Sequence, residues 1–362
     1  MSEPGAFRPP APERGRTNPL ARLGVLLWPL LALGLLMLFN AIFTDGFFAI
    51  RWGEGERAGN LYGSIIDVFN NAAPIALIAV GMTLVIATGG IDLSVGAVLA
   101  IAGAVAATLL ANDVNWVLAV IAALGSGLLC GLVSGLLVAG AGVQPIIATL
   151  ILMVAGRGVA QMVGQNVPVL DKHVAFNYIG GGYFLALPFA VTLVVLVYAV
   201  AIGVMRLTAL GLFVESAGNN PVASRYAGVR VRPVIIVAYL VSGLCAALAG
   251  IVVTSDIKQA DSINAGLYFE LDAILAVVVG GTALVGGRFT LLGSLVGAVL
   301  IQMLNTTILT RGLAFEWGLV TKAVVVLVVC LLQSPDFRRR LSIKRNKPAI
   351  PSTSPAAPTS AS

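Results

Sequence analysis

Long apolar runs, separated by short polar stretches, take up most of the chain. Ten such runs can be delimited, at about 23–43, 74–88, 91–110, 116–139, 146–163, 184–205, 233–254, 271–285, 290–310 and 317–333. Several exceed the roughly 18 residues at which an apolar run favours a membrane span. The runs are continuously apolar rather than alternating, which excludes a membrane β-barrel. The pattern predicts an all-α polytopic membrane protein with about ten transmembrane helices.

The second run is short for a complete span. Residues 60–71 before it alternate between apolar and polar positions, which predicts an interfacial or re-entrant segment. Pro74 suits the first turn of the helix that follows, because a first-turn residue needs no N–H donor. A count of eight spans therefore stays open, provided that two short runs are re-entrant or interfacial.

Charged residues are scarce, and their positions indicate topology. They make up 10% of the chain, whereas a soluble domain has roughly 25%. The net charge is +6, and the basic excess lies in 1–22, 206–232 and 334–362, while 255–270 is acidic. Because basic loops stay in the cytoplasm, both termini and the 206–232 loop are expected inside, which requires an even number of spans. The basic excess is thus explained by topology, and we expect no nucleic-acid partner.

Composition divides the chain into three parts. Residues 1–22 are polar and rich in Pro, Gly and Arg, which predicts a disordered cytoplasmic tail. Residues 23–333 form the membrane domain in the lipid bilayer. Residues 334–362 carry a basic cluster at 338–347 and continue as a Pro/Ser/Thr/Ala-rich, low-complexity tail, which we also expect to be disordered and cytoplasmic.

The stretch 81–96, GMTLVIATGGIDLSVG, joins two apolar runs with almost no loop. Gly89 and Gly90 permit a tight bend. Asp92 and Ser94 are residue types that cap helices by accepting backbone N–H groups. The span count places this junction near a cytoplasmic turn. The residues predict a helix cap at Asp92, and a contact with a polar substrate or a role in gating are the alternatives.

A second glycine-rich stretch resembles this junction. Residues 280–287, GGTALVGG, are similar to 89–96, and both follow short Val/Ala-rich runs. Interrupted short segments in corresponding halves of a transporter indicate a binding site. The similarity has two alternative explanations, an internal repeat of the fold or a chance match between glycine-rich membrane segments.

Three further charged residues lie within or beside apolar runs. Arg157 is flanked by glycines, and Glu270 and Asp272 open the run that follows the acidic loop. Arginine can snorkel or pair with a carboxylate, and acidic groups stabilise a helix N-terminus, so each has a structural explanation beside a role in the transport path. Lys322 is expected to reach the membrane interface. The neutral candidates for the path are Gln144, Gln161, Asn305 and Thr306.

The long polar stretch 206–232 contains helix start and stop signals. A polar turn and a proline precede a short segment that ends at Gly228, which predicts a short cytoplasmic helix. A helix beneath the membrane suits the docking of a partner, and a plain connector is the alternative. The residues assigned to this docking loop are Gly218, Asn219, Asn220, Ala223, Ser224, Arg225 and Gly228.

Several kinds of chemistry lack the residues they need. No G-x-x-x-x-G-K-[ST] loop occurs, so we do not expect the chain to hydrolyse a nucleotide. The single histidine, His173, and three dispersed cysteines offer no metal-ligand spacing. No paired intramembrane carboxylates are available for acid–base catalysis. We expect no catalytic residue, no metal site and no cofactor, which disfavours an intramembrane enzyme.

Four segments resemble the permease subunits of ribose-type ABC sugar importers. They are 81–97, GMTLVIATGGIDLSVGA; 149–161, TLILMVAGRGVAQ; the 217–228 loop; and 271–288, LDAILAVVVGGTALVGGR. Residues 255–272, SDIKQADSINAGLYFELD, are most similar to the galactofuranose branch of that family. The resemblance covers about residues 20–335.

The resemblance implies an importer built from several chains. This chain would be a bacterial inner-membrane permease, paired with a second permease chain that is identical or related. A cytoplasmic ATPase would bind the 217–228 loop, and a periplasmic sugar-binding protein would dock outside. The resemblance also implies the ten-helix fold of the vitamin B12 importer type and import of galactofuranose or a ribose-like sugar. The alternative is an ion-coupled secondary transporter of a small polar solute, in which Asp92 and Arg157 would be coupling groups.

Overall fold

The computed structural model describes residues 19–44, 46–49, 51–52, 60–165, 170–312 and 315–333. The 334–362 tail and all but the last four residues of the 1–22 tail lie outside this part.

The first half of the chain forms α1 (Pro19–Phe43), α2 (Ser64–Ala87), α3 (Val95–Ala111), α4 (Trp116–Gly135) with a π-helical turn at Leu136–Gly140, α5 (Pro145–Val163) and α6 (Val174–Gly181). The second half forms α7 (Phe189–Leu207), α8 (Leu210–Asn219), α9 (Pro221–Tyr226), α10 (Val231–Ile257), α11 (Phe269–Val279), α12 (Leu291–Thr310) and α13 (Phe315–Gln333). Each of the ten predicted runs contains one of these helices.

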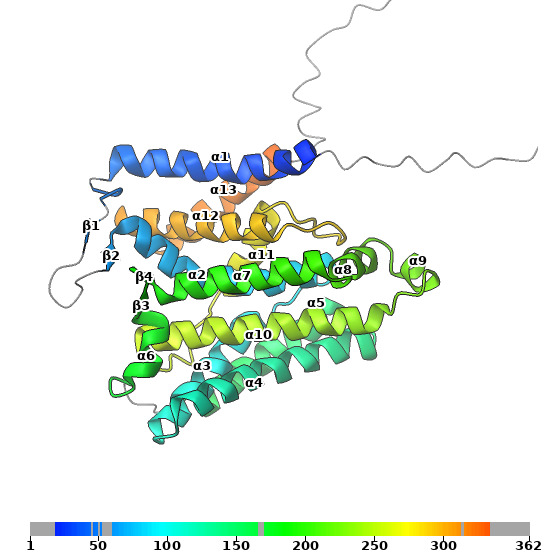
Figure 1. Ribbon diagram of the computed structural model, residues 1–362, viewed down its shortest axis with the longest axis horizontal. Helices are drawn as coiled ribbons and strands as arrows, with labels where there is room; N and C mark the ends of the chain where they lie inside the picture. Colours follow the sequence, from blue (N-terminus) through cyan, green and yellow to red (C-terminus); the bar gives the residue numbers. More distant parts are fainter. Residues whose placement is uncertain are drawn as a thin grey trace, which may run out of the picture.

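Two short antiparallel hairpins lie at the end of the molecule opposite α9 (Figure 1). They pair β1 (Arg51–Trp52) with β2 (Leu61–Tyr62) and β3 (Tyr183–Phe184) with β4 (Leu187–Pro188). The Leu61 N–H donates to the Ala186 carbonyl at 3.0 Å, which joins the two hairpins.

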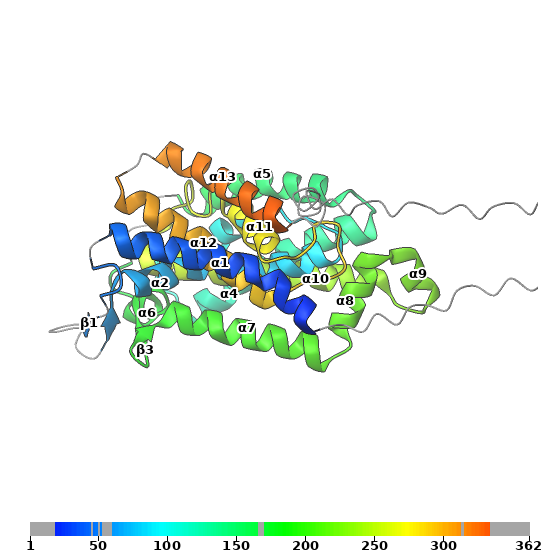
Figure 2. The same cartoon turned by 90° about the horizontal axis from the view of Figure 1, so that it is seen from above.

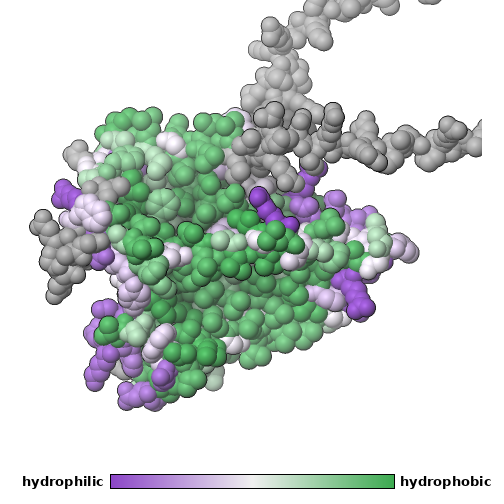
Figure 3. Space-filling model, viewed as in Figure 1, coloured by the Kyte–Doolittle hydropathy of each residue, from purple (hydrophilic) through white to green (hydrophobic). Residues whose placement is uncertain are grey.

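Six helices in the described ranges are long and apolar enough to cross a membrane. They are α2, α4 with its π-helical turn, α5, α7, α10 and α12. Leu27–Phe43 of α1 and the whole of α3 are shorter apolar helices. Figure 3 shows a continuous apolar surface along the helices, with hydrophilic residues gathered toward the two ends. These features confirm the predicted polytopic α-helical membrane protein.

The structure corrects the predicted start of the second apolar helix. α2 begins at Ser64, so residues 64–71 belong to the same continuous helix as the apolar run, and Pro74 lies inside this helix rather than in its first turn. Proline lacks an N–H donor and disrupts an isolated helix. Here α2 packs against both α10 and α12. This packing stabilises the helix on both sides of the proline.

α10 lies at the centre of the bundle, where it packs against α2, α3 and α4 (Figures 1 and 2). The contact with α4 is a backbone contact. A methyl group added at Gly243 would collide with the Gly127 carbonyl and would lie 3.0 Å from the Gly131 backbone. Small residues let membrane helices approach in this way.

Two helices begin inside this bundle. α11 has 11 residues and rises about 16 Å, whereas a bilayer core is about 30 Å thick. It ends at Val279 rather than near 285, because Gly281 adopts a left-handed conformation with φ +88°. α3 starts at Val95, and its next turn packs through Leu99 against Gly250 in the second half of α10. The starts of both helices are therefore available to build a site within the membrane domain.

Candidate functional site

The junction between α2 and α3 buries a carboxylate. Gly89 adopts φ +83°, which turns the chain at the end of α2, and Asp92 is only 2% exposed. Its Oδ1 accepts the Ser94 N–H at 3.0 Å and the Ser94 hydroxyl at 2.6 Å. Its Oδ2 accepts the Ser242 hydroxyl at 2.7 Å. Three donors thus compensate the burial of the carboxylate.

The depth of Asp92 differs from the sequence-based expectation. Ser242 lies near the middle of α10, so Asp92 does not lie at a solvated cytoplasmic turn. After Gly89 and Gly90 the chain doubles back into the bundle before α3 begins. The distribution of charged residues predicts which side of the membrane a loop occupies, but it does not predict that the chain re-enters the bundle. The carboxylate binds the Ser94 N–H one residue before α3 and also ties this junction to α10.

Arg157 and Glu270 converge on the first turn of α3. A methyl group added at Gly96 would collide with Glu270 Oε2 and would lie 3.2 Å from Arg157 Nη2. Arg157 Nη1 donates to the Ala265 carbonyl at 2.6 Å. The two side chains interact electrostatically, but no ion pair within 4.0 Å joins them. Arg157 therefore binds a carbonyl rather than pairing directly with a carboxylate.

Asp272 forms a buried ion pair that links two helices. Its two oxygens lie 2.9 Å from Lys322 Nζ, and the side chains are 8% and 11% exposed. Asn305 also interacts with the Asp272 side chain. Lys322 thus lies in the interior, not at the membrane interface. An acid in the eighth apolar run and a base in the tenth are a signal from which this pair could have been predicted.

The neutral path candidates do not form one site. Gln144 and Gln161 are exposed at opposite ends of α5. Asn305 interacts with Asp272, and Thr306 beside it is partly buried. Of the four, only Asn305 joins a cluster of charged residues.

The docking loop contains two helices rather than one. The predicted α9 is preceded by α8, which sequence analysis did not identify. Asn220 caps α9, since its Oδ1 accepts the Val222 N–H at 3.1 Å and the Ala223 N–H at 2.9 Å. The Ser224 hydroxyl donates to the Ser216 carbonyl at 2.7 Å and holds α9 against α8. The left-handed Gly228, at φ +85°, ends the unit.

The end of α8 contacts both glycine-rich segments. A methyl group added at Gly218 would collide with the Ala87 carbonyl and would lie 2.6 Å from the Gly287 nitrogen. The Gly287 N–H donates to the same Ala87 carbonyl at 2.8 Å, and Asn219 Oδ1 lies close to Gly287. The docking loop, the α2–α3 junction and the α11–α12 connection therefore share one contact point.

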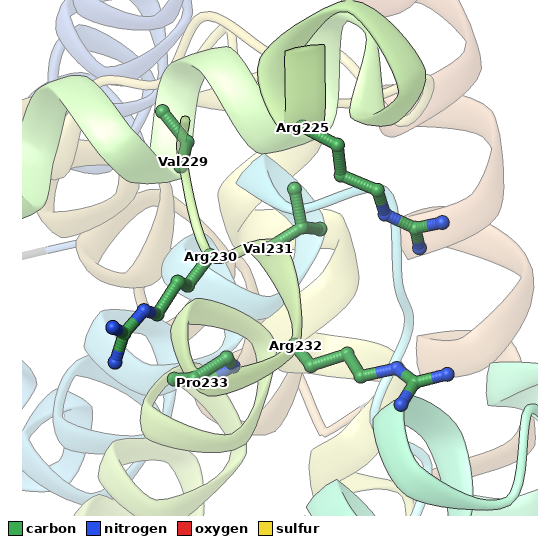
Figure 4. A pocket seen from close by; sticks show the side chains of 6 residues that line it. All are labelled: Arg225, Val229, Arg230, Val231, Arg232 and Pro233. Carbon is green, nitrogen blue, oxygen red and sulfur yellow. The ribbon is translucent and has the colours of Figure 1, made fainter. Parts of the chain in front are cut away.

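A basic pocket lies beside α9. It has a volume of about 370 Å³ and is lined by Arg225, Val229, Arg230, Val231, Arg232 and Pro233. Figure 4 shows Arg225 and Arg232 extending toward one side and Arg230 toward the other. Within the described residues none of these arginines makes an ion pair. Tyr226 next to them is 89% exposed, so the tip of this loop presents basic and aromatic groups to a partner.

The chain is similar to permeases of known transport systems. Residues 64–331 match the family described as branched-chain amino acid transport system / permease component. The chain is 50% identical over 315 residues to the galactofuranose transporter permease protein YtfT of Escherichia coli K12, which covers 86% of this chain and 91% of that one. It is 39% identical to the fructose import permease protein FruF of Bifidobacterium longum (90% and 92% covered) and 36% identical to the ribose import permease protein RbsC of Escherichia coli K12 (84% and 92% covered). No solved structure matches.

Proposed function

The chain belongs to this permease family, and from that premise we propose that it forms the membrane path of an ABC importer for galactofuranose. The predicted family is confirmed: the chain is a ribose-type ABC sugar permease and a multi-pass protein of the inner membrane. The particular sugar is a proposal. It is supported by the identity to the galactofuranose permease, which exceeds that to the fructose and ribose permeases. The ion-coupled alternative has no support.

A permease component is not itself an enzyme, so we propose that a separate cytoplasmic ATPase supplies the energy and binds α8 and α9. The supporting observation is the exposed tip of this loop, where Val222 is 59% and Tyr226 89% exposed. Arg225 on the same helix is exposed and without an ion pair among the described residues. Aromatic and Arg side chains are enriched at protein interfaces.

For the membrane topology we propose ten spans, with both termini in the cytoplasm and the fold of the vitamin B12 importer type. Each of the ten apolar runs contains a helix. The described start of α1 and the end of α13 lie toward the end of the molecule that carries α8 and α9 (Figure 1). A second permease chain and a periplasmic sugar-binding protein complete the proposed assembly.

Reconstitution tests this function. The permease pair, the ATPase and the binding protein are placed in proteoliposomes, and uptake of radiolabelled galactose, whose solutions contain the furanose form, is measured. We expect uptake to require both the loaded binding protein and ATP on the ATPase side. An ATPase variant that cannot hydrolyse ATP is the control. Uptake that follows an ion gradient without the ATPase would refute the importer, and uptake of ribose or fructose alone would refute only the choice of sugar.

A further inference from the structure

The starts of α3 and α11 meet inside the membrane domain. A methyl group added at Gly266, just before α11, would lie 2.6 Å from the Gly96 carbonyl and 3.2 Å from Gly96 Cα. Gly266 adopts φ +68°, a conformation suited to glycine. Two interrupted helices thus direct their N-terminal ends toward one region. In transporters such paired interruptions form binding sites for solutes.

Glu270 has an unsatisfied oxygen in this region. The residue is 7% exposed, and its Oε2 is buried with no hydrogen-bond partner among the described residues. The same oxygen approaches Gly96. A buried polar atom without a partner is unfavourable, and a bound ligand that donates to it is one way in which a native protein satisfies such a group. Asp92 and Asp272, by contrast, have their donors within the chain.

Arg157 supplies donors beside this acceptor. Its Nη1 is held by the Ala265 carbonyl, while Nη2 lies on the Gly96 side, 3.2 Å from the position of an added methyl group. In the part of the chain that the structure describes, the guanidinium makes no other hydrogen bond and no ion pair within 4.0 Å, although Glu270 and Asp261 act on it electrostatically. Arg157 is half-buried, so the group is held in place and remains accessible to a solute.

Exposed apolar and aromatic residues lie next to Glu270 in sequence. Leu267, Tyr268 and Leu271 flank Glu270 in sequence and are 46%, 39% and 48% exposed. α5, which carries Arg157, and α13, against which α11 packs, lie on the side of the molecule away from α7 (Figure 2). A carboxylate accepts from a hydroxyl while a guanidinium donates to its neighbour, and apolar or aromatic side chains pack against the C–H groups of the ring.

We propose that Arg157 and Glu270 form a sugar-binding site in the transport path, where Glu270 Oε2 accepts from one hydroxyl of the sugar and Arg157 donates to an adjacent hydroxyl oxygen. The site rests on the proposed sugar-import function. Because no ion pair within 4.0 Å joins the two side chains, Glu270 Oε2 remains a free acceptor and Arg157 keeps free donors for the solute. Because each makes few contacts, the sugar is held briefly and can be released.

The test uses the reconstituted transporter at saturating loaded binding protein. Initial uptake of the sugar and of a deoxy analogue lacking one ring hydroxyl is compared for the wild type, Glu270→Gln and Arg157→Lys. We expect each variant to take up the sugar about ten-fold more slowly, since a hydrogen bond to a charged group is lost or misplaced. We also expect each to lose most of the wild-type preference for the sugar over the analogue, while the loaded binding protein still stimulates ATP hydrolysis.

Controls separate this site from a structural role and from the proposed function. Asp113→Asn removes an exposed carboxylate after α3 and should behave as the wild type. If Glu270→Gln does not assemble, Glu270→Asp, which keeps the charge and shortens the side chain, should shift the preference in the same direction. Unchanged uptake, or slower uptake with an unchanged preference, would overturn the site. Absence of ATP-driven sugar uptake by the wild type would instead overturn the proposed function.

Discussion

At the scale of single residues, two of the charges inside the membrane domain have partners on other helices. Asp92 accepts from Ser242 of α10, and Asp272 pairs with Lys322 of α13. Removing charge from water is costly, and a buried charge is tolerated only when it is paired and hydrogen-bonded. These contacts join helices that are distant in sequence, so they contribute to the choice of one helix arrangement.

The Asp272–Lys322 pair leads to a stability prediction. Lys322→Ala leaves the buried Asp272 carboxylate without its cation and should destabilise the permease by about 3–5 kcal/mol. The double variant Asp272→Asn with Lys322→Met removes both charges at similar volume and should recover most of that loss. Thermal unfolding in detergent measures both. A double variant as unstable as Lys322→Ala would contradict the explanation by an unpaired charge.

Most of the candidate residues stand out in the sequence, but the residues that form hydrogen bonds or ion pairs with them do not. Asp92 is conspicuous beside Gly89 and Gly90, whereas Ser242 lies 150 positions away and is one of many serines in apolar runs. Its donation to Asp92 depends on tertiary packing, which local patterns do not encode. Arg157 and Glu270 were identified separately for the same reason, since only the fold brings both to Gly96.

At the scale of elements, the contact of α8 with both glycine-rich connections links the docking loop to the membrane helices. The apolar runs predicted where the apolar helices lie but missed α8, whose apolar residues are diluted by Glu215, Ser216 and Asn219. It also misplaced the start of α2. The similarity between 89–96 and 280–287 now has a spatial counterpart, since a methyl group added at Gly286 would lie 2.9 Å from the Gly89 nitrogen and 3.1 Å from the Gly218 carbonyl at the end of α8.

This contact point predicts a defect in coupling. Gly218→Ala places a methyl group against the Ala87 carbonyl, and the overpacking should cost about 1–3 kcal/mol locally. We expect sugar uptake per ATP hydrolysed to fall, because α8 no longer sits against the α2–α3 junction. The measurement is the ratio of the two rates in proteoliposomes.

Gly203→Ala is the matched control for that prediction. Gly203 lies within α7, and an added methyl group there has no atom within 4 Å. The change should leave the ratio unaltered and stabilise the helix by about 0.5–1 kcal/mol. An unchanged ratio in Gly218→Ala, or an equal fall in both variants, would contradict a specific role for the contact.

At the scale of the whole molecule, charge distribution and apolar length predict which loops lie on each side, but not how deep a segment goes between them. The count of ten runs depends on which side of the membrane each loop occupies. The position of Asp92 depends on depth, because the chain re-enters the bundle after Gly90 and no charged residue marks this return in the sequence. The 206–232 loop was placed from its arginines alone, and in Figure 1 its helices lie at one end of the bundle.

The proposed topology can be tested with single cysteines in a variant that lacks Cys130, Cys245 and Cys330. Asp171, just before α6, and Tyr226, at the end of α9, are exposed, and Figure 1 shows α6 and α9 at opposite ends of the molecule. With ten spans and both termini inside, a membrane-impermeant maleimide should label Asp171→Cys in intact spheroplasts. It should label Tyr226→Cys and Ser354→Cys only after the membrane is permeabilised, because positively charged segments stay in the cytoplasm. Labelling of Ser354→Cys in intact cells while Tyr226→Cys is protected would require an odd number of crossings after α9 and would exclude the ten-span arrangement.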